Sequence, residues 1–177
     1  MALLEIALQL SKYKLKNAVR FAFWTAEEFG LVGSTHYITN LPEAERQKIG
    51  VYLNFDMIAS PNGGHFIYDG DGSVFNLTGP TGSDRIEKLF QDYFVKVNVK
   101  SGSAAFSGSS DYGPFLDVGI PSGGVNTGAG GIKTAEQVSW CVRSSAPRNY
   151  LTSTTMQVGR RSWYSIRQVL PSGMRWN

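Results

Sequence analysis

The chain has 177 residues, of which 42% are hydrophobic and 18% are charged, with a net charge of +3 at pH 7. This length and apolar content suffice for one buried core, so a single domain is expected. No apolar run approaches the roughly 20 residues that a membrane-spanning helix needs, and the only cysteine, Cys141, excludes an internal disulfide bond.

The charge is unevenly distributed along the chain. Residues 1–136 contain all 14 acidic residues and have a net charge of −3, whereas residues 137–177 contain six arginines and neither lysine nor acid. A basic tail can bind nucleic acid or an anionic membrane. Because these arginines follow no helical period, we expect neither partner.

Apolar periodicity predicts alternating helices and strands. In chain order these are a helix over 3–12, a strand over 18–25, a short helix through Tyr37, a helix over 43–48, strands over 51–59 and 65–68, a helix from Ser83 to Tyr93, a short helix from Asp111 to Leu116 capped by Asp111, and a strand over 120–125. Such alternation indicates an α/β/α sandwich with a mixed, mostly parallel central sheet.

Three acidic residues follow apolar segments. Glu27 and Glu28 come directly after the predicted strand 18–25, and Asp56 lies at the end of the next apolar run, 51–57. Open α/β sheets build their sites at the carboxyl ends of strands, and ionised acids there are costly unless a partner such as a metal ion binds them. A solvated acidic loop before a helix gives the same pattern, because acids favour the positive end of a helix. Spacing alone leaves both interpretations open.

The sequence around these acids resembles that of the co-catalytic, double-zinc aminopeptidases, a family that includes secreted leucyl aminopeptidases. The motifs appear in the family's order as Trp24-Thr25-Ala26-Glu27-Glu28-Phe29-Gly30, Asn54-Phe55-Asp56-Met57 and Ser110-Asp111-Tyr112-Gly113-Pro114-Phe115. The resemblance covers about residues 1–137. It implies a peptide hydrolase that removes N-terminal residues, with Glu27 as the general base, Glu28 as a ligand of one zinc ion and Asp56 as a ligand of the other.

Other parts of the family pattern are absent from this chain. The resemblance places a His-x-Asp motif and a bridging Asp upstream of the first predicted helix, and a last His ligand beyond residue 137. The only histidines, His36 and His65, match none of these places and are expected to be structural. We therefore expect an incomplete, inactive copy, in which residues 1–137 form a partial zinc-peptidase domain. Residues 138–177 are expected to be a non-family basic tail, disordered or artefactual.

Two alternatives to an aminopeptidase remain open. A non-catalytic family member could serve as a binding module that keeps Glu27, Glu28 and Asp56 as relics, and a glutaminyl cyclase-like acyltransferase would use similar acids around one zinc ion. The resemblance implies secretion, although no signal peptide is recognisable. The sequence predicts neither the substrate-binding residues nor the oligomeric state.

Two loops have informative compositions. Residues 101–111 are small and polar and are expected to form a pocket wall, with Ser109 at a position where many relatives carry Arg. The glycines at 123–131 lack the Gly-Lys-Ser/Thr pattern of a phosphate-binding loop, so no nucleotide site is expected.

Overall fold

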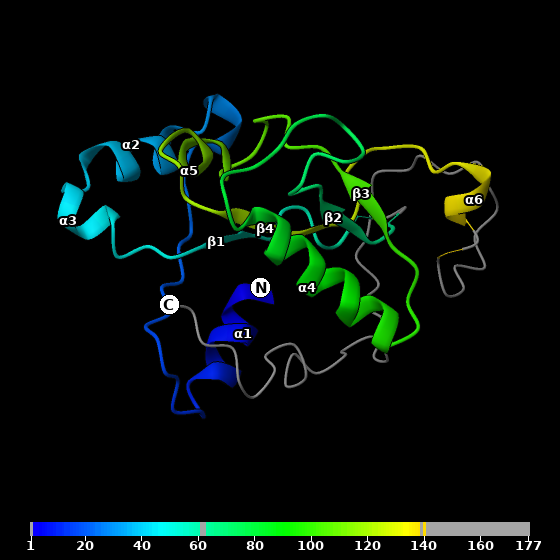
Figure 1. Cartoon of the computed structure of the whole chain (residues 1–177), viewed down its shortest axis with the longest axis horizontal. Helices are drawn as coiled ribbons and strands as arrows, with labels where there is room; N and C mark the ends of the chain where they lie inside the picture. Colours follow the sequence, from blue (N-terminus) through cyan, green and yellow to red (C-terminus); the bar gives the residue numbers. More distant parts are fainter. Residues whose placement is uncertain (1, 61–62, 139, 141–177) are drawn as a thin grey trace.

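The computed structural model describes residues 2–60, 63–138 and 140. Its centre is a four-stranded sheet in the order β1-β4-β2-β3 (Figure 1). The strands are β1 (Tyr52–Asn54), β2 (Phe66–Tyr68), β3 (Gly102–Ala104) and β4 (Ser122–Asn126). β1 pairs in parallel with β4, and β2 pairs in parallel with β3, whereas β2 and β4 are antiparallel. The sheet is therefore mixed and mostly parallel, as the sequence predicts.

Helices precede, connect and follow these strands. They are α1 (Ala2–Leu10), the 3-10 helix η1 (Glu27–Phe29), α2 (Val32–Asn40), α3 (Glu43–Arg46), α4 (Ser83–Lys96), α5 (Gly113–Asp117) and α6 (Ala135–Val138). Of these, α4 and α5 pack against the sheet. Compared with the predictions, α1 ends earlier, at Leu10, and α2 continues beyond Tyr37 to Asn40. In the part of the chain that the structure describes, no helix is both long and apolar enough to cross a membrane.

Helices pack on both faces of the sheet. Ile67 and Tyr68 are neighbours on β2, so their side chains point to opposite faces. Ile67 packs against Ile86 and Phe90 of α4, which runs beside β2 and β4 in Figure 1. Tyr68 packs against Tyr112, on the side of α5. The three layers confirm the predicted α/β class, and they place the loops after β1 and before α5 on the same side of the molecule.

Three expectations for the strands differ from the structure. Residues 18–25 form no strand, because a strand needs a neighbour with which to form a hydrogen-bond ladder, and among the described residues this segment has none. Val19 and Phe23 are consequently 53% and 60% exposed. Residues 102–104, expected to be loop, form β3 by pairing with β2. The predicted strand 51–59 is also shorter, since β1 ends at Asn54.

Candidate active site

The two adjacent glutamates lie in η1, between two residues with left-handed backbone conformation. Ala26 has φ 53° and Gly30 has φ 97°. Glycine adopts this conformation freely, whereas it costs other residues about 1–3 kcal/mol and persists only when the surroundings impose it. Here the carbonyl of Ala26 accepts the N–H groups of Phe29 and Val32, at 3.3 and 3.2 Å. These bonds hold the turn that presents Glu27 and Glu28 before α2.

Helix α2 is fixed against this turn by a very close backbone approach. The N–H of Gly33 donates to the carbonyl oxygen of Thr25 at 3.1 Å. A Cβ atom at position 33 would lie 2.6 Å from that oxygen and 2.9 Å from the Thr25 nitrogen. Only glycine fits this contact, so the second glycine of the Gly-Leu-Val-Gly sequence sets the distance between α2 and the residues that lead into Glu27.

Asp56 follows the end of β1 and lies beside the loop that precedes α5. The hydroxyl of Ser110 donates to Oδ2 of Asp56 at 3.5 Å, a contact longer than the usual 2.7–2.8 Å of O–H···O bonds. Ser110 also accepts a hydrogen bond from Asn54 Nδ2 at 3.0 Å. The motifs around Asp56 and Ser110, more than 50 residues apart in the sequence, therefore meet in space.

Four carboxylates form one electrostatic group, which we call the acid site: Glu27, Glu28, Asp56 and Asp111. Partial burial raises the pKa of Glu27, and the negative charges of Glu28, Asp111 and Asp56 raise it further. The structure thus places Glu28 and Asp56, the other two sequence-predicted residues, close enough to Glu27 to raise its pKa. It adds Asp111, which is not the expected cap of α5, because Tyr112 occupies that position.

Asp111 is the most buried member of the acid site. Its side chain is 8% exposed, and its Oδ1 has no hydrogen-bond partner among the described residues. Burial raises the pKa of Asp111, a hydrogen bond from Ser34 lowers it, and the charge of Asp56 raises it. A buried carboxylate oxygen without a donor is costly when ionised, and a nearby cation would offset this cost. In the sequence, the position of Asp111 directly after Ser110 in the third motif is the feature that could have identified it as a site residue.

The donors of the acid site are chemically suited to zinc, because carboxylate oxygens are among the ligands of this metal. A tetrahedral zinc site takes four ligands, and the sequence resemblance predicts two of them, Glu28 and Asp56. Neither histidine joins them. His36 lies on α2 and contacts Asn40 Nδ2 at 3.3 Å. His65 lies before β2, with its ring 5.4 Å from that of Phe94.

A second group of carboxylates, the loop acid cluster, consists of Asp69, Asp71 and Glu87. In the part of the chain that the structure describes, it is the one set of three potential ligands whose oxygens all lie within 4.8 Å of one another. Oε2 of Glu87 accepts the N–H groups of Gly70 and Asp71, and Oδ2 of Asp69 accepts those of Val74 and Phe75. These bonds hold the loop between β2 and α4, so the cluster has a structural explanation.

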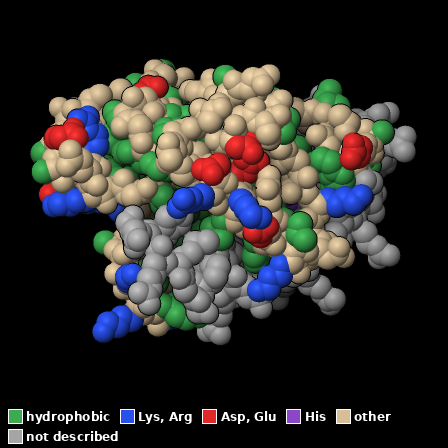
Figure 2. Space-filling model, viewed as in Figure 1, with side chains coloured by type: hydrophobic (Ala, Val, Ile, Leu, Met, Phe, Trp, Pro, Cys, Tyr) green, Lys and Arg blue, Asp and Glu red, His purple; other side chains and the backbone are tan. Residues whose placement is uncertain are grey.

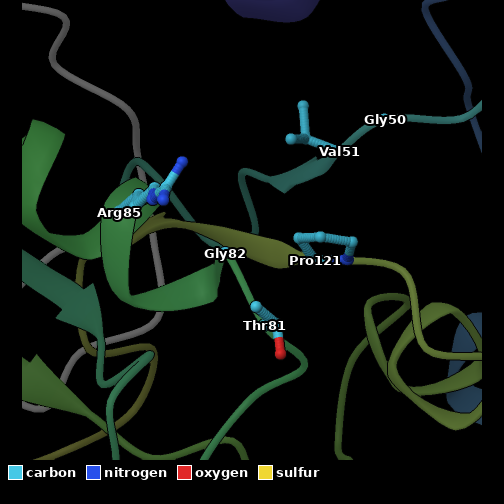
Figure 3. Close-up of a pocket in the computed structure, with 6 residues that line it drawn as sticks. All are labelled: Gly50, Val51, Thr81, Gly82, Arg85 and Pro121. Atoms are coloured by element: carbon cyan, nitrogen blue, oxygen red, sulfur yellow. The ribbon is translucent and has the colours of Figure 1, made fainter. Parts of the chain in front are cut away.

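A small hollow lies at the opposite end of the strands from the acid site. It has a volume of about 180 Å³ and is lined by Gly50, Val51, Thr81, Gly82, Arg85 and Pro121 (Figure 3). Residues 51 and 121 precede β1 and β4, whereas Asp56 follows β1. The hollow is therefore separate from the acid site. On the face in Figure 2, acidic and basic side chains of the described residues are interspersed, without a patch of one sign.

The chain is similar to known aminopeptidases in sequence and in structure. A family model, "Peptidase family M28", matches residues 1–161. The "Probable leucine aminopeptidase 2" of Aspergillus fumigatus is 57% identical over 134 residues, which are 76% of this chain and 27% of that protein. The "probable leucine aminopeptidase 2" of Aspergillus oryzae is 57% identical over 136 residues, or 77% and 27%. The chain thus spans about a quarter of the length of these curated relatives.

Solved structures of aminopeptidases are also similar to this chain. A zinc aminopeptidase from Bacillus subtilis superimposes with a TM-score of 0.59 at 28% identity, covering 72% of this chain and 30% of that one. An aminopeptidase from Aneurinibacillus sp. strain AM-1 superimposes with a TM-score of 0.56 at 29% identity, covering 71% and 28%. The resemblance inferred from the motifs around Glu27, Asp56 and Ser110 is confirmed, and the chain belongs to peptidase family M28.

Proposed function

We propose that this chain carries part of the active site of a zinc-dependent aminopeptidase, which removes residues from the N-termini of peptides. The observation that carries the proposal is the meeting of Glu27, Glu28 and Asp56 in one acid site, on motifs in the order typical of aminopeptidases. Relatives at 57% identity are named leucine aminopeptidases, which supports an apolar first residue in the substrate and disfavours a cyclase-like transferase.

In this proposal Glu27 is the general base. Its pKa is raised toward the pH at which it must exchange protons, which is the direction that a general base requires. Glu27 takes a proton from the attacking water and passes it to the amine that leaves when the peptide bond breaks. Zinc, when bound, lowers the pKa of a coordinated water from 15.7 to about 7. Glu28 and Asp56 are the residues of this chain that would each hold one ion.

We also propose that the 177-residue chain is not active by itself. Two matched carboxylates cannot fill a tetrahedral zinc shell, so we expect weak, substoichiometric zinc binding and no aminopeptidase turnover. Calorimetric titration of the purified chain with zinc tests this expectation. Two tightly bound zinc ions per chain would contradict it. The division of the sequence at residue 137 stays a prediction, because residues 141–177 lie outside the described residues.

A chimera tests the proposed activity. The matched segment of the Aspergillus fumigatus relative, 27% of its length, would be replaced by the aligned 134 residues of this chain. We expect hydrolysis of leucine p-nitroanilide, lost with a chelator and restored by zinc. The unmodified relative, prepared in parallel, is the control. A folded chimera that binds two zinc ions without turnover would contradict the proposal.

Secretion of the whole protein is a further part of the proposal, supported by the resemblance to secreted leucyl aminopeptidases. An antibody raised against this chain, applied to culture medium and to cell lysate from the source organism, tests it. Exclusive recovery from the lysate would contradict secretion.

A further inference from the structure

A continuous series of hydrogen bonds runs beneath the acid site. Trp24 Nε1 donates to Tyr52 OH at 3.0 Å, and Tyr52 OH donates to Asn54 Oδ1 at 3.3 Å. Asn54 Nδ2 donates to Ser110 Oγ at 3.0 Å, and Ser110 Oγ donates to Asp56 Oδ2 at 3.5 Å. The series begins three residues before Glu27 and ends on Asp56, so it joins the two segments that carry the proposed base and one proposed ligand.

The chemistry of the two ends fixes the direction of every bond in the series. An indole N–H can only donate, and an ionised carboxylate can only accept. The hydroxyl of Tyr52 therefore accepts a hydrogen bond from Trp24 and donates its own proton to the amide oxygen of Asn54. This orientation turns the amide nitrogen of Asn54 toward Ser110, and the proton of the Ser110 hydroxyl is left for Asp56.

Because the middle of the series is buried, water cannot easily replace its hydrogen bonds. Asn54 is 4% exposed and Ser110 is 6% exposed. The second Nδ2 proton of Asn54 has its own acceptor, the hydroxyl of Tyr68, at 3.3 Å. Burial raises the pKa of Tyr52 and raises that of Tyr68 to about 12, so both phenols keep their protons at neutral pH. Hydrogen bonds in such a low-dielectric network reinforce one another, and breaking one leaves a costly unpaired group.

We propose that Asn54 is a positioning residue of the acid site. By donating to Ser110, Asn54 directs the Ser110 hydroxyl at Oδ2 of Asp56, and through Tyr52 it ties Asp56 to the segment that carries Glu27. The meaning of this positioning for catalysis rests on the proposed function, whereas the hydrogen-bond series does not. If Asn54 served only to satisfy buried polar groups under β1, a change at Tyr52 would not be transmitted to Asp56.

A double-mutant cycle on the metal-free 177-residue chain separates these two roles. Tyr52→Phe removes one hydroxyl without changing charge, which releases the amide of Asn54 from its fixed orientation. We expect it to shift the side-chain carboxyl ¹³C resonance of Asp56 in the NMR spectrum. Ser110→Ala removes the last link, so Tyr52→Phe should cause no such shift in the Ser110→Ala background. Tyr93→Phe, on α4 and outside the series, is the matched control and should leave the Asp56 resonance in place.

The same shift in both backgrounds, or no shift in the wild-type background, would overturn the proposal. If Tyr52→Phe does not fold, as judged by circular dichroism, Trp24→Phe takes its place, because it removes the first donor of the series. Trp24→Phe should then shift the Asp56 resonance in the wild-type background and not in the Ser110→Ala background, and any other pattern would overturn the proposal. Because no zinc or turnover enters these measurements, their failure is distinct from failure of the aminopeptidase chimera.

Discussion

The acid site and the loop acid cluster both consist of carboxylates, but they differ in how many hydrogen bonds these carboxylates accept. In the loop acid cluster, Asp69 and Glu87 are buried and each accepts two backbone N–H groups through a single oxygen. In the acid site, Asp111 Oδ1 is buried without a partner, and Asp56 receives one long hydrogen bond from Ser110. Under the proposed function, proximity of carboxylates therefore does not by itself distinguish the catalytic group from the structural one. Their unused capacity to accept hydrogen bonds is the more informative property.

The largest expected effect concerns the acid site in the aminopeptidase chimera. Glu27→Ala should leave the zinc content intact and lower kcat by roughly 10²–10⁴-fold, the usual contribution of a general base. Asp56→Ala should lose zinc as well as activity, because a ligand is removed. Atomic absorption and steady-state kinetics, with circular dichroism on both variants, measure the difference. Loss of zinc in Glu27→Ala together with its retention in Asp56→Ala would reverse the assigned roles.

The next effect concerns the loop acid cluster. Asp69→Ala removes the buried carboxylate that accepts the N–H groups of Val74 and Phe75, and a hydrogen bond to a charged group contributes about 1.5–3 kcal/mol. We expect the free energy of unfolding, measured with urea, to fall by roughly 3 kcal/mol. Asp117→Ala, at an exposed position in α5, should change it by less than about 0.5 kcal/mol. Equal effects of the two substitutions would remove the structural explanation of the cluster.

The smallest expected effect is an increase in the free energy of unfolding, caused by a substitution in the acid site. The pKa of folded Asp111 is raised above 3.8, so the cost of burying its charge is fully present above the raised pKa. This cost disappears as the pH falls through the raised pKa toward the ordinary value. Asp111→Asn has the same shape without the charge and should stabilise the metal-free chain by about 1 kcal/mol near pH 7.

Urea unfolding of Asp111→Asn and of the unmodified chain at several pH values checks both the sign and the pH dependence. The gain in stability should shrink as the pH is lowered from about 7 to about 4. A gain that stays constant over this range would show that the charge of Asp111 is not its source.

The elements that could be predicted from the sequence are those with a strong local signal. Helix α4 was predicted because Ile86 and Phe90 follow a helical period, and β2 because it is a short apolar run after a turn. By contrast, the apolar residues of 18–25 predicted a strand, but strand formation depends on a neighbour that no local pattern can reveal. β3 was missed for the converse reason, since Gly102 and Ser103 have a weak strand preference and are ordered by pairing with β2.

The candidate site was predictable to a similar extent. The motifs identified Glu27, Glu28 and Asp56 as candidates, and their roles remain predictions. Asp111 was interpreted as a helix cap, because a sequence does not show which polar side chain ends up buried without a donor. The hydrogen-bond series through Asn54 was also beyond prediction, since it links residues from three separate segments of the chain.

The close contact between Gly33 and Thr25 has a consequence for sequence variation. Gly30 has open space around the position of a Cβ atom, and its requirement is one of backbone conformation, with φ 97°. Asparagine, which tolerates left-handed conformations, is therefore an acceptable substitute there. At Gly33 the obstacle is the backbone of Thr25 itself, which no choice of side chain avoids. In a saturation-mutagenesis library selected for folding, position 30 should retain asparagine alongside glycine, whereas position 33 should retain glycine alone.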